Sequence, residues 1–268
     1  MRANFGNGRR NPEGGNASLG RGGGDGGTAG KELLLGWTPQ HPALFDLNRM
    51  TSIQRITDET LPLAVTALTR RDDHFARAVA EAGLPPLRYR PPGFETLLRI
   101  IVAQQVSLAS AAAIWSRLEE LIGEFRPEAL LSFEEEELRK AGLSRQKARY
   151  ARSLAELLAK GELDLAVIER LDDEEAVACL TRVKGLGRWS AECYLLFSHG
   201  RPDVFPAEDV GLMLGLQSLY GLPERPNAKE LRQVAEAWKP YRAVAARLLW
   251  HYRRFALRPA GAAGSGVA

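Results

Sequence analysis

Apolar residues recur at spacings of three and four along most of the chain, which is the pattern of amphipathic α-helices. The stretches LPLAVTALTRRD and DHFARAVAEAG show it first, and PYRAVAARLLWHYRRFAL shows it near the C-terminus. We find no alternating run of apolar and polar residues long enough to predict a β-strand. The pattern therefore predicts an all-α fold of many short helices joined by short loops.

Capping residues mark the ends of several predicted helices. Ser144 and Asp172 stand directly before apolar-periodic runs and are predicted N-caps, while Gly142 and Gly161 are predicted to end the helices before them. We place a break between FETLLRIIVAQQVS and SLASAAAIWSRLEELIG. The small side chains of residues 110–113, near the start of that second stretch, are predicted to permit close packing against another helix.

Composition divides the chain into three parts. Residues 1–57 include a long glycine-rich stretch with few large apolar side chains, so we expect this N-terminal extension to be disordered. Residues 58–258 form the predicted helical domain, and residues 259–268 form a short tail that we also expect to be disordered. Met50 begins a more ordinary sequence, and we expect it to be the true translation start.

Composition and charge restrict the class of protein. A hydrophobic fraction of 45% and a charged fraction of 26% are typical of a globular protein, and a formal net charge of +3 permits nucleic-acid binding without requiring it. No apolar run approaches the ~20 residues of a membrane span, and glycine follows the N-terminal arginines, so we expect a cytoplasmic protein. The two cysteines, Cys179 and Cys193, cannot form a disulfide framework or a four-cysteine iron–sulfur cluster.

The stretch VKGLGRWSAE predicts a hairpin between two helices. Gly185 and Gly187 allow a tight backbone and bring the amides of a helix start close to an anion, and Lys184 and Arg188 add positive charge beside them. On these residues alone, a plain turn between two helices is the simpler interpretation. Asp209 follows in VFPAED after a proline turn. An acid there is ordinarily a helix cap, but it can also project into a cleft beside the hairpin.

Two further stretches contain residues that a purely structural helix does not need. AQQVS places Gln105 and Ser107 between two predicted helices, although glutamines are more often simply solvated. The stretch AWKPYRAVAARLLWHYRR contains Trp238 and Trp250, although most tryptophans pack in a core. Neither stretch indicates a function by itself.

Taken together, the three stretches resemble the helix-hairpin-helix superfamily of DNA glycosylases, in which a glycine/proline-rich loop and an aspartate follow the hairpin. The resemblance covers about residues 58–258 and is greatest to the alkylbase branch of DNA-3-methyladenine glycosylase II type, in a compact form without its N-terminal α/β domain. It implies two helical subdomains with the active-site cleft between them. It also implies that Asp209 is the catalytic acid and that Trp189, Trp250 and Cys193 line the base pocket.

The same resemblance implies how DNA is held. Gln105 is the expected wedge that fills the gap left by an extruded base. The expected DNA contacts beside it are Ser107, Lys184, Gly185, Gly187 and Arg188. The backbone carbonyls of Thr181, Val183 and Leu186 are expected to hold a structural monovalent cation, and we expect no other cofactor and no catalytic metal.

Trp189 stands where lyase-active members of the superfamily carry a lysine that forms a Schiff base with the sugar. We therefore expect base release without strand cleavage. Alkylated purines such as 3-methyladenine and 7-methylguanine are cationic, so their glycosidic bonds are already weak. Asp209 then has to stabilise an oxocarbenium-like sugar and position water. The expected partner is double-stranded DNA containing alkylated bases, which a monomer would bind.

Two other functions fit parts of the sequence. A non-catalytic helix-hairpin-helix module that only binds DNA needs the hairpin but neither Asp209 nor the tryptophans. A glycosylase for oxidised or mismatched bases would share the fold and differ in the pocket. A purely structural helical bundle would require all three stretches to be coincidences. Base release from methylated DNA separates these functions.

Overall fold

The computed structural model describes residues 53–257. Within this range every regular element is a helix, which confirms the all-α prediction. The expectation for Met50 falls outside the described residues, as do nearly all of residues 1–57 and the whole of the tail at 259–268. No helix in the described range is both long enough and apolar enough to cross a membrane.

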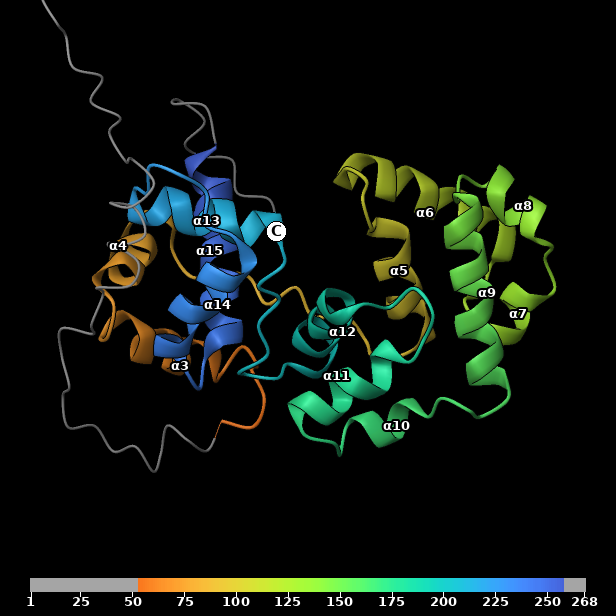
Figure 1. The fold of residues 1–268 in the computed structure, drawn as a ribbon, viewed down its shortest axis with the longest axis horizontal. Helices are drawn as coiled ribbons and strands as arrows, with labels where there is room; N and C mark the ends of the chain where they lie inside the picture. The colour runs from red at the N-terminus through yellow and green to blue at the C-terminus, as the bar shows by residue number, and fades with distance from the viewer. Residues whose placement is uncertain (1–52, 258–268) are drawn as a thin grey trace, which may run out of the picture.

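The helices form two groups that lie side by side (Figure 1). The central subdomain comes from the middle of the chain, and its helices α5, α7 and α8 pack against α9, while α12 packs against α5 and α11. Its elements are α5 (Phe94–Ala103), α6 (Leu108–Ile122), α7 (Pro127–Leu131), α8 (Glu135–Lys140), α9 (Arg145–Ala159), α10 (Leu165–Ile168), α11 (Asp173–Thr181), α12 (Arg188–Tyr194) and the π-helical turn η1 (Leu195–His199).

The terminal subdomain combines both ends of the described chain. Its last helix, α15, packs against α13, α3 and α4. Gly215 lets α13 approach α15 closely, because a Cβ at this position would lie 2.7 Å from the carbonyl oxygen of Leu249. The elements are α3 (Leu61–Thr69), α4 (Asp73–Ala82), α13 (Val210–Tyr220), α14 (Ala228–Ala235), the 3₁₀ turn η2 (Glu236–Trp238) and α15 (Arg242–Ala256).

The local signals in the sequence explain most helix boundaries. Ser144 accepts a hydrogen bond from the amide of Lys147, and Asp172 caps α11 in the same way, so both predicted N-caps are confirmed. Gly142 and Gly161 follow helix ends with φ of +112° and +70°, a conformation that glycine adopts without strain. The predicted break before α6 is also present, and Ser107 caps that helix.

One packing prediction is wrong. Ser110, Ala112 and Ala113 are exposed on α6, so no helix within residues 53–257 covers their side chains. The physical reason is that α6 buries a different face, whose apolar residues are larger: Ile114, Trp115 and Leu118. The small side chains are simply on the solvent side of an amphipathic helix.

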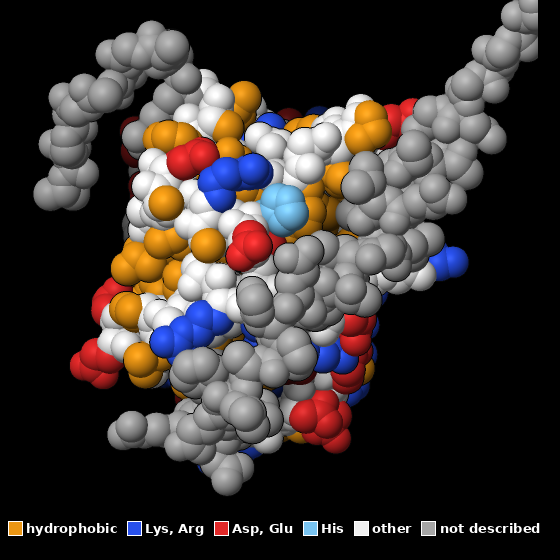
Figure 2. All heavy atoms as spheres, turned by 90° about the vertical axis from the view of Figure 1, so that its left-hand side faces the viewer, with side chains coloured by type: hydrophobic (Ala, Val, Ile, Leu, Met, Phe, Trp, Pro, Cys, Tyr) orange, Lys and Arg blue, Asp and Glu red, His pale blue; other side chains and the backbone are white. Residues whose placement is uncertain are grey.

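Large apolar side chains form the cores of both subdomains. Leu97, Ile101 and Leu154 are fully buried in the central subdomain. Trp238 is fully buried in the terminal subdomain, where its Nε1 donates to Asp72 Oδ2 over 3.3 Å. Trp238 is therefore a core residue, which was the simpler interpretation. On the described part of the face seen in Figure 2, acidic, basic and apolar side chains are mixed rather than segregated, which does not favour phosphate binding there.

Candidate active site and DNA-binding groove

A pocket of about 360 Å³ brings the predicted catalytic and base-binding residues together. Asp209, Trp189, Cys193 and Trp250 all line it. They come from three different helices or helix starts, since Trp189 and Cys193 lie on α12, Asp209 precedes α13 and Trp250 lies on α15. The volume is in the range of pockets that enclose small ligands. The structure therefore places in one cavity residues that lie up to 61 positions apart, from Trp189 to Trp250.

The carboxylate of Asp209 is held by three N–H donors. Trp250 Nε1 donates to Oδ1 over 2.9 Å, and Trp189 Nε1 donates to Oδ2 over 3.1 Å. The amide of Leu212 also donates to Oδ1, over 3.0 Å, so Asp209 is the N-cap of α13 as well. A carboxylate fixed through both oxygens has little freedom to rotate. Its position at a helix N-terminus also places it at the positive end of the helix dipole.

Aromatic rings form one wall of the pocket. Phe197 stacks on Trp250 with ring centroids 5.5 Å apart and an interplanar angle of 21°. Cys193 lies below them and is buried. Burial raises the pKa of the Cys193 thiol well above its usual value, and the nearby Asp209 raises it further, so the thiol stays protonated. Cys193 is therefore a pocket wall and not a nucleophile.

Phe197 was not predicted as a pocket residue, although its spacing in the sequence contained the signal. Phe197 follows Trp189 and Cys193 at intervals of four, which on a helix places all three on one face. Four arginines of this pocket were missed as well. They are Arg88, Arg247, Arg253 and Arg254. The last three lie on α15 within four residues of Trp250, so helical spacing again indicated them.

Arg247 has a structural role behind the aromatic wall. It donates hydrogen bonds to the carbonyl oxygens of Leu196, over 2.9 Å, and Leu87, and its guanidinium carbon lies 5.1 Å from the centre of the Phe197 ring. Burial lowers the pKa of Arg247 to about 10, with a further contribution from Arg88. These contacts tie the loop before α5 and the turn η1 to α15.

A groove of about 910 Å³ continues from Asp209 to the hairpin. The hairpin occupies the residues between α11 and α12, and Val183 and Leu186 are its buried anchors. Gly185 has a φ of +94°, and a Cβ there would overlap the ring of Tyr150 on α9. Gly187 is the exposed N-cap of α12. Both glycines and Lys184 line the groove, and their contacts with DNA stay predictions.

The opposite wall of the groove carries the predicted wedge. Gln105 is exposed and has a φ of +54°, which is uncommon for a residue with a side chain and costs about 1–3 kcal/mol. Such strain persists only where neighbouring contacts enforce it, and it is concentrated at functional positions. The structure thus places Gln105 at the groove, whereas its role as a wedge stays a prediction.

Two other predicted DNA contacts have partners within the protein. Arg188 forms ion pairs with Glu174, at 2.5 Å, and with Glu192, at 2.8 Å, so its guanidinium first of all joins α11 and α12. Ser107 is exposed, and its Oγ caps α6 by accepting from Ser110 N. Contacts of Arg188 and Ser107 with DNA phosphates stay predictions.

The predicted cation site would use the carbonyls of Thr181, Val183 and Leu186. All three residues line the groove, and the Val183 carbonyl already accepts a hydrogen bond from Leu186 N over 3.0 Å. A carbonyl has two lone pairs, so this bond leaves it able to coordinate a cation. The residues fit a monovalent ion in this respect, and the site stays a prediction. Across residues 53–257 no group of His, Cys, Asp or Glu side chains is arranged to hold a metal.

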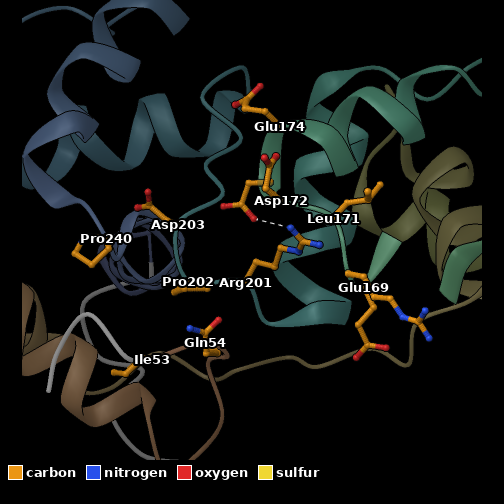
Figure 3. Close-up of a pocket in the computed structure, with 12 residues that line it drawn as sticks. Ile53, Gln54, Glu169, Leu171, Asp172, Glu174, Arg201, Pro202, Asp203 and Pro240 are labelled. Carbon is orange, nitrogen blue, oxygen red and sulfur yellow. Dashed lines mark hydrogen bonds and ion pairs between the residues drawn. The ribbon is translucent and has the colours of Figure 1, made fainter. Parts of the chain in front are cut away.

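A further depression, of about 680 Å³, lies between the start of α11 and the loop that follows η1 (Figure 3). Its lining includes Glu169, Asp172, Glu174 and Asp203. Arg201 projects into it and is bound to Asp173 over 2.9 Å. This lining is dominated by acids and shares no residue with the pocket around Asp209, so it does not suit a DNA phosphate backbone.

Comparison with known proteins agrees with this geometry. DNA-3-methyladenine glycosylase 1 of Schizosaccharomyces pombe is 32% identical over 210 residues, which cover 72% of this chain and 90% of that protein. The structure of the S. pombe 3-methyladenine DNA glycosylase Mag1 in complex with abasic DNA aligns with a TM-score of 0.64, at 33% identity, over 70% of this chain and 95% of that one. A DNA-3-methyladenine glycosidase from Bacillus halodurans aligns with a TM-score of 0.60 at 37% identity, over 72% and 89% of the two chains.

The match extends through both halves of the site. Residues 98–240 fit the sequence profile of the family described as HhH-GPD superfamily base excision DNA repair protein. This range contains the groove, the hairpin and Asp209, while Trp250 lies just beyond it. With the helical fold, the hairpin and the aspartate in their expected places, this chain belongs to the HhH-GPD superfamily of base excision DNA repair proteins.

Proposed function

We propose that the protein is a monofunctional DNA glycosylase that removes alkylated purines of the 3-methyladenine and 7-methylguanine type from duplex DNA. The observation that carries this proposal is the Asp209 carboxylate, which two tryptophan indoles fix at the edge of an aromatic pocket. A module that only binds DNA would need the hairpin but not this arrangement. The relatives named as 3-methyladenine glycosylases support the same class of substrate.

The proposed reaction depends on the positive charge that develops on the sugar. When the alkylated base leaves with the electrons of the glycosidic bond, C1′ of the sugar becomes positive and oxocarbenium-like. Asp209 stabilises that charge electrostatically, and it accepts the proton of the water that attacks C1′. Because the three hydrogen bonds hold the carboxylate in place before the reaction, little reorganisation is needed in the transition state.

Recognition of the base relies on the aromatic wall. The faces of Trp189 and Trp250 attract a cationic base, by about 1–2 kcal/mol once water is excluded. The arginines of the pocket oppose a positive base, and Asp209 offsets part of their charge. Burial and the nearby Arg254 lower the pKa of Arg88. Since Arg88 and Arg254 are both exposed and repel each other, a DNA phosphate between them would relieve that repulsion.

Base flipping uses the groove. Extrusion of a nucleotide costs a few kcal/mol, and Gln105 offsets part of that cost by filling the vacated stack. Lys184 and the amides near Gly185 and Gly187 hold the DNA backbone on the other wall. One copy of the chain contains the pocket, the acid and both walls of the groove, which supports action as a monomer on chromosomal DNA.

Hydrolysis without strand cleavage is part of the proposal. Trp189 occupies the position where lyase-active members carry lysine, and none of the described residues that line the pocket is a lysine. No amine is then available there to form a Schiff base with the sugar. The expected product is an abasic site in an intact strand. A strand break without alkali treatment, or a protein–DNA adduct trapped by borohydride, would contradict this part.

The decisive experiment measures base release from methylated duplex DNA by chromatography. Asp209→Asn should bind the same DNA but release 3-methyladenine and 7-methylguanine at least about 100-fold more slowly, because the negative charge is lost. Asparagine is also a good N-cap, so α13 should remain intact. Asp164→Asn, which changes the exposed N-cap of α10, is the matched control and should release bases normally. Unchanged release by Asp209→Asn would favour the binding module.

A panel of other lesions tests the remaining alternative. Duplexes with 8-oxoguanine or a mismatched base should be poor substrates, because they lack the positive charge that the aromatic wall attracts. Preferential excision of such a base would assign the protein to a different glycosylase class.

A further inference from the structure

Gln104, the neighbour of the predicted wedge, connects the two walls of the groove. Its side-chain Nε2 donates to the carbonyl oxygen of Gly185 over 2.9 Å and to Ser190 Oγ over 3.0 Å. Gly185 belongs to the hairpin, and Ser190 is a buried residue of α12. A backbone carbonyl can only accept, so the NH₂ group of Gln104 must face the hairpin. The amide of Gln104 therefore joins two segments that lie 81 positions apart in the chain.

The surroundings fix the two segments that this amide joins. α5 ends at Ala103, and Gln104 is its C-cap with extended backbone. Lys147 of α9 donates to the carbonyl of Val102 over 2.8 Å, which anchors the end of α5. The ring of Tyr150, one turn further along α9, fills the space beside Gly185. α9 thus supports both the end of α5 and the hairpin, and Gln104 closes the gap between them.

Gln105 follows directly and has the left-handed backbone. Nothing in its own exposed side chain holds that conformation, so the constraint comes from the residues on either side. On the other side of the junction, Ser190 directly follows Trp189, which donates to Asp209. A chain of contacts therefore runs from Gln105 through Gln104 and α12 to the catalytic carboxylate.

We propose that Gln104 is a positioning residue that couples the wedge to the hairpin, so that gripping the DNA backbone and displacing the base occur as one event. This inference rests on the proposed glycosylase function and on Gln105 as the wedge. Gln104 itself touches neither the base nor the sugar. Its contribution matters only where a base stack must be opened, which is the case in duplex DNA and not in a single strand.

The test compares duplex and single-stranded oligonucleotides that contain the same 7-methylguanine. Gln104→Met keeps the length of the side chain and loses both donors. Release under single-turnover conditions should fall roughly tenfold for the duplex, the loss expected for two ordinary hydrogen bonds. Release from the single strand should change less than about twofold, because no stack is opened there.

Controls separate this role from a general defect. Gln233→Met makes the same substitution on the exposed face of α14 and should leave both rates unchanged. Ser190→Ala removes one of the two acceptors and should produce a smaller loss in the same direction. If Gln104→Met does not fold, Ser190→Ala serves as the test variant in its place. The fluorescence of a 2-aminopurine beside the lesion should report less unstacking when saturating Gln104→Met is bound.

The outcomes are distinct. If the wild-type protein releases the base from neither substrate, the proposed function fails. If it releases the base and Gln104→Met lowers both rates by the same factor, Gln104 supports only the general fold of the site and the coupling proposal is overturned. An unchanged rate on duplex DNA overturns it as well. A selective loss on the duplex supports it.

Discussion

Trp250 and Asp209 are joined by a hydrogen bond of 2.9 Å between the indole Nε1 and Oδ1 of the carboxylate. A residue that lines the pocket therefore also holds the carboxylate. In the proposed function, a base that enters the pocket contacts the ring, while the N–H at the edge of the same ring keeps the carboxylate in place. Base binding and catalysis would then share one side chain.

Replacement of Trp250 by Phe separates these two contributions. The ring that stacks on Phe197 is kept, and the N–H that Asp209 accepts is lost. We expect kcat to fall about tenfold or more, since a hydrogen bond to a charged group contributes about 1.5–3 kcal/mol, while DNA binding changes little. Trp115→Phe, which removes an indole–carboxylate bond to Glu119 in α6, should leave activity unchanged. Equal losses in kcat and affinity would show that Trp250 acts through packing alone.

Gly211 offers a test of how tightly the side chains of Asp209 and Trp250 are packed. A Cβ at this position would lie 2.8 Å from Asp209 Oδ1 and 3.2 Å from Trp250 Nε1. Gly211→Ala should therefore displace the bond between them and lower kcat at least about tenfold. The unfolding free energy should fall by no more than about 1–2 kcal/mol, because the helix preference of alanine, about 0.5–1 kcal/mol, offsets part of the lost hydrogen bond. Unfolding in urea and single-turnover base release measure the two effects.

Gly215→Ala is the matched variant on the same helix. Its Cβ would meet Leu249 of α15 instead of the side chains of Asp209 and Trp250. We expect this variant to lose about 1–3 kcal/mol of unfolding free energy, because overpacking forces two helices apart. If Gly215→Ala were the less active and more stable of the pair, the assignment of the two contacts would be wrong.

The hairpin contains a second matched pair of glycines. Gly185→Ala places a side chain where φ is +94° and where the Tyr150 ring already lies, so we expect a loss of about 2 kcal/mol or more in stability together with weaker DNA binding. Gly187 has a φ of −82° and open space at its Cβ position, so Gly187→Ala should lose no more than about 1 kcal/mol, the cost of alanine at the N-cap of α12. Thermal unfolding of the two variants checks this, and equal destabilisation would contradict it.

Stability should depend on pH through His199. Burial lowers the pKa of His199, and the nearby Arg201 lowers it further. Its Nε2 is buried and has no hydrogen-bond partner among the described residues. The unfolded chain therefore binds a proton more readily than the folded one, and the unfolding free energy should fall as pH decreases below about 6.5.

His199→Phe tests this sign. The variant keeps a ring beside Tyr194, which meets His199 edge-on with centroids 5.2 Å apart. Between about pH 7.5 and about pH 5.5, the wild-type protein should lose up to roughly 1.4 kcal/mol per pH unit more than the variant. Urea unfolding at both pH values measures the difference. A wild-type protein whose stability falls no faster than that of His199→Phe would contradict the prediction.

Sequence patterns predicted the helical fold and several helix caps because both depend on local order. Ser144 and Asp172 cap helices through bonds only three residues long, and such signals are visible in one dimension. Asp209 and Trp189 were predicted as site residues from the resemblance to the glycosylase superfamily, and the structure places them side by side. The direct bond between them was not predicted, since it depends on how the loop after η1 returns to α12.

Other features depend on tertiary packing and had no adequate local signal. Gln104 and Gln105 are identical side chains in adjacent positions, and only the fold makes one a bridge and the other an exposed tip. Arg188 was predicted to contact phosphate, and its ion pair with Glu174 depends on how α11 folds against α12, whereas its partner Glu192 lies one turn further along the same helix. The solvent-facing position of residues 110–113 likewise follows from packing, because α6 buries the face that carries its larger apolar side chains.

The terminal subdomain is assembled from α3 and α4 at one end of the described chain and from α13 to α15 at the other. During synthesis, α3 and α4 leave the ribosome before the central subdomain, yet the helix that covers them, α15, leaves after every other helix of the described range. The central subdomain, whose helices are contiguous in sequence, has all of its partners well before that. The pocket around Asp209 therefore forms only after α15 has been synthesised, when Trp250 reaches Asp209, and a chain that stops short of α15 has the hairpin but lacks the wall that Trp250 supplies to this pocket.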